Sequence, residues 1–151
     1  MSLGPRLGVL AVLLWLPAVA VIDAEELLTL RVHMAFPETM MTLQSIIKQH
    51  GHTLSRIQRV DKGLKKSGYE SDKYRVVFFG RRQEIQRWSK LYPELIPFLP
   101  YKIVIYADDQ DTMLVAANPR QLFPAAKDKL RRVLNRWHGD LQAIFQDMKK
   151  E

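Results

Sequence analysis

The 151-residue sequence contains no cysteine, and this absence excludes several classes of site. Thiol nucleophiles, iron–sulfur clusters, covalently attached c-type haem and cysteine-ligated zinc all require this residue. Disulfides are excluded as well, so the fold must be stabilised by the packing of its core. No internal repeat and no low-complexity stretch occurs.

The motifs that mark the common enzyme classes are also missing. There is no Gly-x-x-x-x-Gly-Lys phosphate loop and no Gly-x-Ser-x-Gly nucleophile elbow. His50-Gly51-His52 could offer two imidazoles to a metal, but Gly51 predicts the end of a helix, and the two rings need not converge. The acidic run 108–111 lacks the glycine and the last carboxylate of a calcium loop, so we expect a hairpin turn. We therefore expect no metal and no cofactor.

The first twenty residues have the features of an export signal. Arg6 precedes an apolar run over residues 9–16, and Pro17-Ala18-Val19-Ala20 supplies the small residues of a cleavage site. We predict a signal peptide over residues 1–20, cleaved near Ala20, and hence an exported, periplasmic protein. An uncleaved membrane anchor is the alternative, but the uncharged stretch 7–22 is shorter than the roughly twenty apolar residues that span a bilayer.

Positive charge is concentrated in one part of the sequence. Residues 56–90 contain eleven Lys and Arg against four Asp and Glu, an excess equal to the whole formal net charge of +7. In an exported protein this excess suits an anionic membrane surface, an acidic partner protein or a small anion, and export disfavours nucleic acid. A solvated face that confers solubility is the alternative. The candidate binding residues are Arg56, Arg59, Lys62, Lys65, Lys66, Arg81 and Arg82.

Hydrophobic periodicity predicts alternating strands and helices in the first half of the chain. Alternation over residues 27–35 predicts a strand that directs His33 away from the core. Pro37 and Gly51 bound a helix, and the weakly patterned residues 52–60 follow as an edge strand. Residues 61–72 are predicted as a loop with room for one helical turn. Residues 74–79 are apolar on both faces and predict a central strand.

The second half of the chain continues with two helices and a hairpin. A helix over residues 83–91, with Ile85, Trp88 and Leu91 facing inward, precedes a proline-constrained connection over 92–100. Residues 101–107 and 112–117 form two strands of a hairpin across the turn at 108–111. From residue 124 onward, apolar residues at helical spacing predict a long amphipathic helix that only Gly139 interrupts.

These elements together predict an α+β fold. It consists of an antiparallel five-stranded sheet in the order β-α-β-β-(α)-β-β-α, with helices packed on one face and a long C-terminal amphipathic helix. The expected division of the chain is a signal peptide over 1–20, a single domain over 21–123, and a helix over 124–151 that packs on or extends the domain. This length suits one core rather than two.

Several segments also resemble a known family. They are IQRVDKGLKKSGY (57–69), YRVVFFG (74–80), YPELIPFLP (92–100), KIVI (102–105) and LVAANP (114–119). Over about residues 27–123 the sequence resembles the domain of unknown function 302 family. This resemblance implies a small α+β domain with a TATA-binding-protein-like topology, and it implies a homodimer. It implies no catalytic residue.

The strands offer more apolar surface than helices on one face can cover. We expect a second copy of the chain or a ligand on the free face, and the alternative is that loops and the long helix cover both faces. The residues grouped on one face are Val77, Phe79, Val104, Tyr106 and Val115, opposite Val76, Phe78, Ile103, Ile105 and Leu114. These features favour a non-catalytic binding or assembly module for an anionic ligand or acidic partner. An enzyme, or a carrier of a cofactor or metal, with a site assembled only in the fold is the alternative.

Overall fold

The computed structural model of the protein describes residues 26–151. The predicted signal peptide, residues 1–20, and its cleavage site lie outside the described residues. Within residues 26–151, none of the helices is both long enough and apolar enough to span a membrane.

The fold is built on one five-stranded antiparallel sheet, as the sequence predicts. The spatial order is β1-β5-β4-β3-β2, so β2 is an edge strand, as expected, and β1 is the other edge. The strands β4 and β5 form the predicted hairpin. The strand bounds are β1 Leu27–Val32, β2 Thr53–Arg59, β3 Tyr74–Gly80, β4 Tyr101–Asp108 and β5 Asp111–Ala117.

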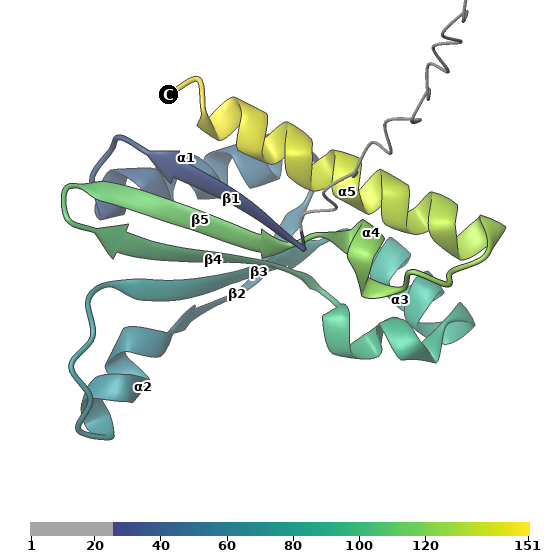
Figure 1. Ribbon diagram of the computed structural model, residues 1–151, viewed down its shortest axis with the longest axis horizontal. Coiled ribbons are helices and arrows are strands. Elements are labelled where there is room, and N and C mark those ends of the chain that lie inside the picture. Colours follow the sequence, from purple (N-terminus) through teal and green to yellow (C-terminus); the bar gives the residue numbers. More distant parts are fainter. Residues whose placement is uncertain (1–25) are drawn as a thin grey trace, which may run out of the picture.

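The helices form a layer on one face of the sheet and two groups at its ends. The two long helices, α1 and α5, lie on the same face, α3 and α4 lie near one end of the strands, and α2 projects from the other end (Figure 1). The segment 61–72, predicted as a loop with room for one helical turn, contains most of α2, which is longer than one turn. The bounds are α1 Phe36–Gln49, α2 Val60–Lys66, α3 Arg82–Leu91, the 3-10 helix η1 Pro93–Phe98, α4 Pro119–Leu122 and α5 Asp128–Met148.

The core lies between the sheet and the two long helices. Helix α1 contributes Leu43 and Ile47, and α5 contributes Trp137 and Ile144, each almost completely buried. Burying side chains of this size stabilises the fold by about 1.5–3 kcal/mol apiece. Because α5 supplies much of one layer, the C-terminal helix is part of the single core.

The register between strands corrects the expected grouping of side chains on the two faces. Val77 pairs with Ile103, and both lie on the face that the helices cover. Val76 pairs with Val104 on the other face. The grouping of Val77 with Val104 is therefore wrong. Alternation fixes the faces within one strand, but only the register relates one strand to the next, and a shift of one residue exchanges the faces.

The weak pattern of β2 has a local cause. The register slips between Leu54 and Arg56, so Ser55 is an extra residue, and its hydroxyl donates to the Phe78 carbonyl at 3.2 Å. A bulge of this kind places two covered-face residues, Leu54 and Ile57, three positions apart rather than two. A strict two-residue alternation therefore does not occur.

One inward-facing residue of α3 was assigned wrongly. Trp88 is buried as predicted, but Leu91 is half exposed. Tyr92 takes the inward position instead, and its ring stacks on that of Trp88 with centroids 5.9 Å apart. Tyr92 follows the last helical residue and has non-helical backbone angles, so helical spacing does not predict where its side chain lies.

Candidate functional site

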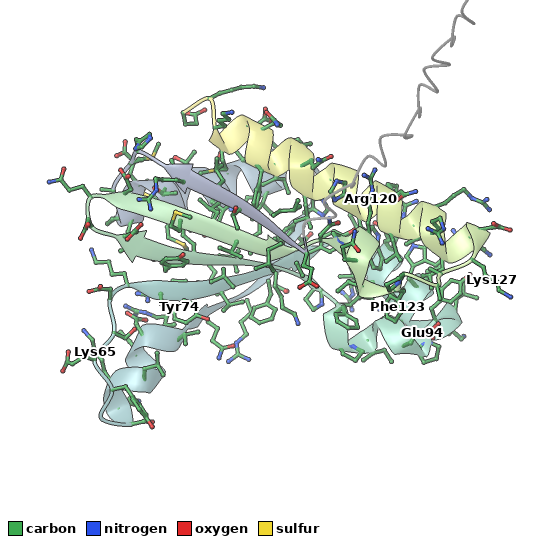
Figure 2. All side chains as sticks on the ribbon, in the orientation of Figure 1. Lys65, Tyr74, Glu94, Arg120, Phe123 and Lys127 are labelled. Atoms are coloured by element: carbon green, nitrogen blue, oxygen red, sulfur yellow. The ribbon has the colours of Figure 1, made fainter. Side chains whose placement is uncertain are left out.

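A small basic surface lies where β2 passes into α2. We call it the basic arm, and it consists of Arg59, Lys62, Lys65 and Lys66. Three of these residues lie on α2 at spacings of three and four, so they share one side of the helix. All four are exposed. Figure 2 shows Lys65 projecting from this end of the molecule, far from Lys127 at the start of α5.

One buried ion pair anchors the arm to the sheet. Asp61 on α2 accepts a short hydrogen bond from the guanidinium of Arg75 on β3, and only about an eighth of each side chain is exposed. The guanidinium carbon lies 5.6 Å from the centre of the Phe36 ring. The hydrogen bond from Arg75 holds the pKa of the Asp61 carboxyl below its usual range. Asp61 therefore stays ionised and keeps α2 against the sheet.

The same pair leaves the cations of the arm without a neutralising carboxylate. Asp61 is the single acid of α2, and Arg75 already occupies it. Among residues 26–151, none of the four arm side chains has an ion-pair partner. Two acids, Glu70 and Asp72, follow in the exposed loop before β3 and are not paired with the arm either. The arm thus carries positive charge without an ion pair among residues 26–151, although Arg59 lies near enough to Asp61 for its charge to add to the effect of Arg75 in lowering the pKa of that carboxyl.

The structure divides the predicted set of seven basic residues. Arg56 pairs with Phe78 in the register and lies on the face of the sheet opposite the helices, a few residues before the arm. Arg81 and Arg82 follow the far end of β3, a strand of seven residues that spans roughly 20 Å. They are therefore separate from the arm. Arg82 is exposed at the start of α3, whereas Arg81 belongs to a network of its own.

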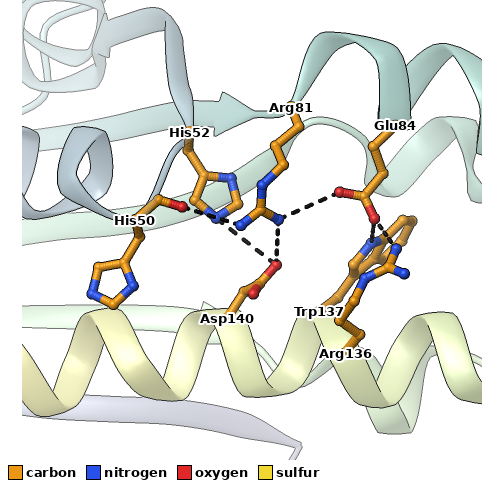
Figure 3. A network of polar contacts seen from close by, with 7 residues as sticks. All are labelled: His50, His52, Arg81, Glu84, Arg136, Trp137 and Asp140. Atoms are coloured by element: carbon orange, nitrogen blue, oxygen red, sulfur yellow. Dashed lines mark hydrogen bonds and ion pairs between the residues drawn. The ribbon is translucent and has the colours of Figure 1, made fainter.

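Arg81 is the centre of a polar network between α3 and α5 (Figure 3). Its guanidinium donates to Asp140 at 2.7 Å, to Glu84 at 3.5 Å and to the His50 carbonyl at 3.1 Å. Glu84 also accepts from Arg136 and, at 3.2 Å, from the indole N–H of Trp137. Every cation in this network has a carboxylate partner.

Two buried polar side chains lie behind this network. His52 has no exposed side-chain area, and its Nε2 is 3.9 Å from the nearer oxygen of Asp140, beyond hydrogen-bonding distance. The hydroxyl of Tyr101 is buried as well, and its ring centre is 5.6 Å from that of His52. Within residues 26–151, the two nitrogens of His52 and the hydroxyl of Tyr101 have no hydrogen-bond partner.

Burial controls the protonation of both groups. Loss of hydration lowers the pKa of His52 to about 4, the charge of Arg81 acts in the same direction, and Asp140 opposes it. Burial likewise raises the pKa of the Tyr101 hydroxyl above its usual range. At neutral pH the pair is therefore an uncharged imidazole and an uncharged phenol. Such groups can donate or accept hydrogen bonds, but solvent does not reach them directly.

Metal binding finds no support in the described residues. Across residues 26–151, no three His, Asp or Glu side chains gather where they could hold a metal ion. The two histidines of the His50-Gly51-His52 segment do not converge, because His50 bonds Asp147 on α5 at 2.8 Å, whereas the His52 ring is buried against Phe79 and Tyr101. Gly51 has a φ of +74° and ends α1 between them, as predicted.

The sheet face opposite the helices carries an apolar strip. We call it the open face. Its residues are half-buried, and Tyr106 is 36% exposed. Neither α1 nor α5 covers them, so the expected free face is present, although with a different set of β3 residues. The strip consists of Val76, Phe78, Val104, Tyr106, Met113 and Val115.

Sequence reasoning missed the acceptors of the polar network. Asp140 is 59 residues from Arg81 along the chain, and no spacing rule connects the two; nor does one connect Arg81 with Tyr101, which lies behind the network. Only Glu84 could have been predicted from the sequence, because it lies three residues after Arg81 and could pair with it on a helix. The predicted site therefore included Arg81 without the residues that neutralise it.

Comparison with known proteins gives the family. A family model described as a domain of unknown function, DUF302, matches residues 28–148. The chain belongs to the DUF302 family. The match confirms the resemblance in the sequence and extends it past residue 123 through α5, in agreement with the place of this helix in the core.

A solved structure shares the DUF302 fold. The crystal structure of an uncharacterized conserved DUF302 protein from Bacillus stearothermophilus superposes with a TM-score of 0.75 at 23% sequence identity. The comparison covers 83% of this chain and 99% of that chain. At this identity the likeness confirms the α+β fold alone. No curated protein matches the chain.

Proposed function

We propose that this DUF302 chain is a non-catalytic, exported binding module whose basic arm holds an anionic ligand or the acidic surface of a partner. The observation that carries the proposal is the free charge of the arm. Its four cations are exposed and, among residues 26–151, lack any ion-pair partner. Arg81 at the other end of β3 differs, because carboxylates occupy it, whereas its neighbour Arg82 is exposed and has no ion-pair partner among residues 26–151.

The shape of the arm supports the same function. Helix α2 projects from the body of the molecule, and three lysines on one of its sides can meet a flat or convex anionic surface together (Figure 1). Each Lys or Arg near an anionic lipid surface contributes about 1 kcal/mol to binding. Three or four such residues acting together are sufficient for a measurable affinity.

Assembly as a homodimer through the open face is the second part of the proposal. The half-buried strip on β3, β4 and β5 supports it, because a second copy would remove apolar surface from water on both partners. Light scattering at tens of micromolar should give the mass of a dimer, and Val104→Lys should give a monomer. A monomeric parent protein would contradict this part.

The test of the arm uses three anionic probes with the protein. They are poly-glutamate, vesicles with one third anionic lipid, and inorganic phosphate. We expect binding to at least one, and a loss of at least about 30-fold in affinity for Lys62→Glu with Lys65→Glu, since two contributions of about 1 kcal/mol are removed. The probe that binds best indicates whether the ligand of the arm is an acidic protein, a lipid surface or a small anion.

A matched control changes the same charge elsewhere. Lys127→Glu with Lys129→Glu alters two exposed lysines at the start of α5, where acids are favourable beside a helix N-terminus. This variant should bind each probe within about threefold of the parent, because non-specific charge effects on binding are small at this distance. Equal losses in both double variants would reject a role for the arm.

One observation favours the alternative, an enzyme or a carrier of a bound group. His52 and Tyr101 bring together buried polar atoms without partners among residues 26–151, and such atoms cluster at functional sites. A mass and absorption survey of the purified protein would support this alternative if a stoichiometric small molecule or metal is found and His52→Phe removes it.

A further inference from the structure

We propose that a pocket at the junction of the sheet with η1, α4 and α5 binds a medium-chain monocarboxylate, with the apolar chain inside and the carboxylate on Lys102. This site is distinct from the basic arm and would have a different ligand, but it shares Val104 and Val115 with the open face. Six elements line it, from Leu27 at the start of β1 to Leu141 on α5.

The pocket has the composition of an apolar ligand site. Its wall includes Val115 from β5, Phe98 from η1, Leu122 from α4 and Trp137 from α5. Most of the exposed wall is apolar. Small-molecule sites are typically apolar clefts with a few polar groups that orient the ligand. An alkyl chain in this pocket would lose contact with water on the sides that the wall encloses.

Lys102 supplies the orienting polar group. Among the described residues that line the pocket, it is the only charged side chain. Its ammonium donates one hydrogen bond to the Pro97 carbonyl at 3.1 Å, which holds it at the rim of the pocket. An ammonium has three donors, so two remain for an incoming carboxylate. No lining carboxylate competes for them, and the ligand is therefore an anion rather than a cation.

The size of the pocket limits the length of the chain. The cavity is about 230 Å³. At about 30 Å³ for each water-sized group, this volume holds roughly eight such groups. A carboxylate with about eight carbons therefore fills the pocket, whereas a sixteen-carbon chain extends into water.

The experiment titrates the full chain with octanoate and with octan-1-ol by calorimetry. Octanoate should bind saturably with one site per chain, and octan-1-ol should bind at least about tenfold more weakly, because a charged hydrogen bond to Lys102 is lost. Butanoate should bind more weakly than octanoate, and hexadecanoate should gain no affinity over octanoate, because its additional methylenes stay in water. Equal affinities for octanoate and octan-1-ol, or no saturable binding of octanoate, would overturn the proposal.

Two variants test the named residues. Lys102→Met keeps the apolar stem and should lower the affinity for octanoate at least about tenfold, to that for octan-1-ol, while Lys73→Met, a change at an exposed lysine outside the pocket, leaves it unchanged. Ala117→Leu fills the pocket from an exposed strand end and should weaken both ligands at least about tenfold. An unchanged affinity in either test variant would contradict the assignment.

Measuring the oligomeric state shows whether the pocket is a ligand site or a contact between two copies of the chain. Light scattering on Ala117→Leu should give the mass of the parent protein. If the mass changes and octanoate binds as in the parent, the pocket is part of an interface and the proposal fails. If the basic arm does not bind anions, the binding of octanoate in the pocket is not affected. The two proposals can therefore fail separately.

Discussion

The basic arm and the network around Arg81 hold their cations, four in the arm and two in the network, in different surroundings. In the arm, four exposed cations face solvent, and the nearest carboxylate, Asp61, is taken by Arg75. In the network, Arg81 and Arg136 share Glu84, Arg81 also pairs with Asp140, and both carboxylates are mostly buried. Charge in the network holds α5 against α3, whereas charge in the arm is available to a partner. A count of basic residues along the chain does not make this distinction.

The largest expected effect is on the pH dependence of stability, and it arises behind the network. His52 has a pKa of about 4 in the folded protein and about 6.5 when unfolded. Between these values the unfolded chain binds a proton that the folded chain does not, so the free energy of unfolding falls as the pH drops from 6.5 to 4. The loss is at most about 3 kcal/mol.

Urea unfolding of the parent and of His52→Phe at pH 7, 5.5 and 4.5 measures the loss of unfolding free energy that His52 causes. Phenylalanine cannot titrate, so the variant should lose less stability than the parent over this range. The replacement should itself be tolerated, because it removes two buried nitrogens that lack partners and keeps the ring contacts with Phe79 and Tyr101. Identical pH profiles would show that His52 does not control acid stability.

The next prediction compares the loss of stability when one arginine from each region is replaced. Arg81→Ala should lower the free energy of unfolding by about 1–2 kcal/mol, because it leaves the mostly buried Asp140 and the His50 carbonyl without a donor. Arg59→Ala should change it by no more than about 0.5 kcal/mol, as is usual for an unpaired surface side chain. Urea unfolding of both variants at pH 7 is the measurement. Equal losses would remove the distinction between structural and free charge.

A third prediction compares two helical glycines. A Cβ at Gly63 in α2 or at Gly139 in α5 would meet no atom within 4 Å, and neither position has a positive φ. Gly139→Ala should raise the free energy of unfolding by about 1 kcal/mol. Gly63→Ala should raise it by less than half as much, because α2 is short and packs mainly on β3, so it opens locally before the core unfolds.

Hydrogen exchange provides the readout for this difference. The amides of α2 should exchange through a local opening that Gly63→Ala slows, whereas Gly139→Ala should slow exchange across the sheet. Equal gains in global stability for the two variants would mean that the arm unfolds together with the core.

The smallest expected effect is on stability, when the charge of one arm residue is reversed. Lys62→Glu places an acid in the first turn of α2, three and four residues before Lys65 and Lys66. We expect a stabilisation of about 0.5 kcal/mol from the helix dipole and the new pairs. Thermal unfolding at low and high salt measures it, and the gain should shrink in 1 M salt. A destabilised variant would mean that Lys62 already has a structural role.

The sequence predicts most of the fold because its apolar residues follow regular periods. The helix bounded by Pro37 and Gly51 and the hairpin across residues 108–111 are both found where periodicity and turn residues place them. The faces of β3 were not predictable in the same way. Register depends on pairing between strands, and the bulge at Ser55 shows that one extra residue also hides the pattern within a strand.

The candidate site was predictable in part for a related reason. Lys62, Lys65 and Lys66 are near one another in the sequence and remain so in the fold. Arg81 was grouped with them by sequence distance, but a whole strand separates it from the arm. Its partner Asp140 comes from another element, and only the packing of α5 on the sheet brings the two together.

The position of α2 between β2 and β3 has a consequence for how this protein could be altered. These strands are antiparallel neighbours, so a two-residue turn could join them directly. The arm is therefore an insertion into a hairpin, and its length and sequence can vary without rearranging the five-stranded sheet. A shortened hairpin would, however, leave Arg75 without Asp61, so a graft at this site needs either a replacement acid or an apolar residue in place of Arg75.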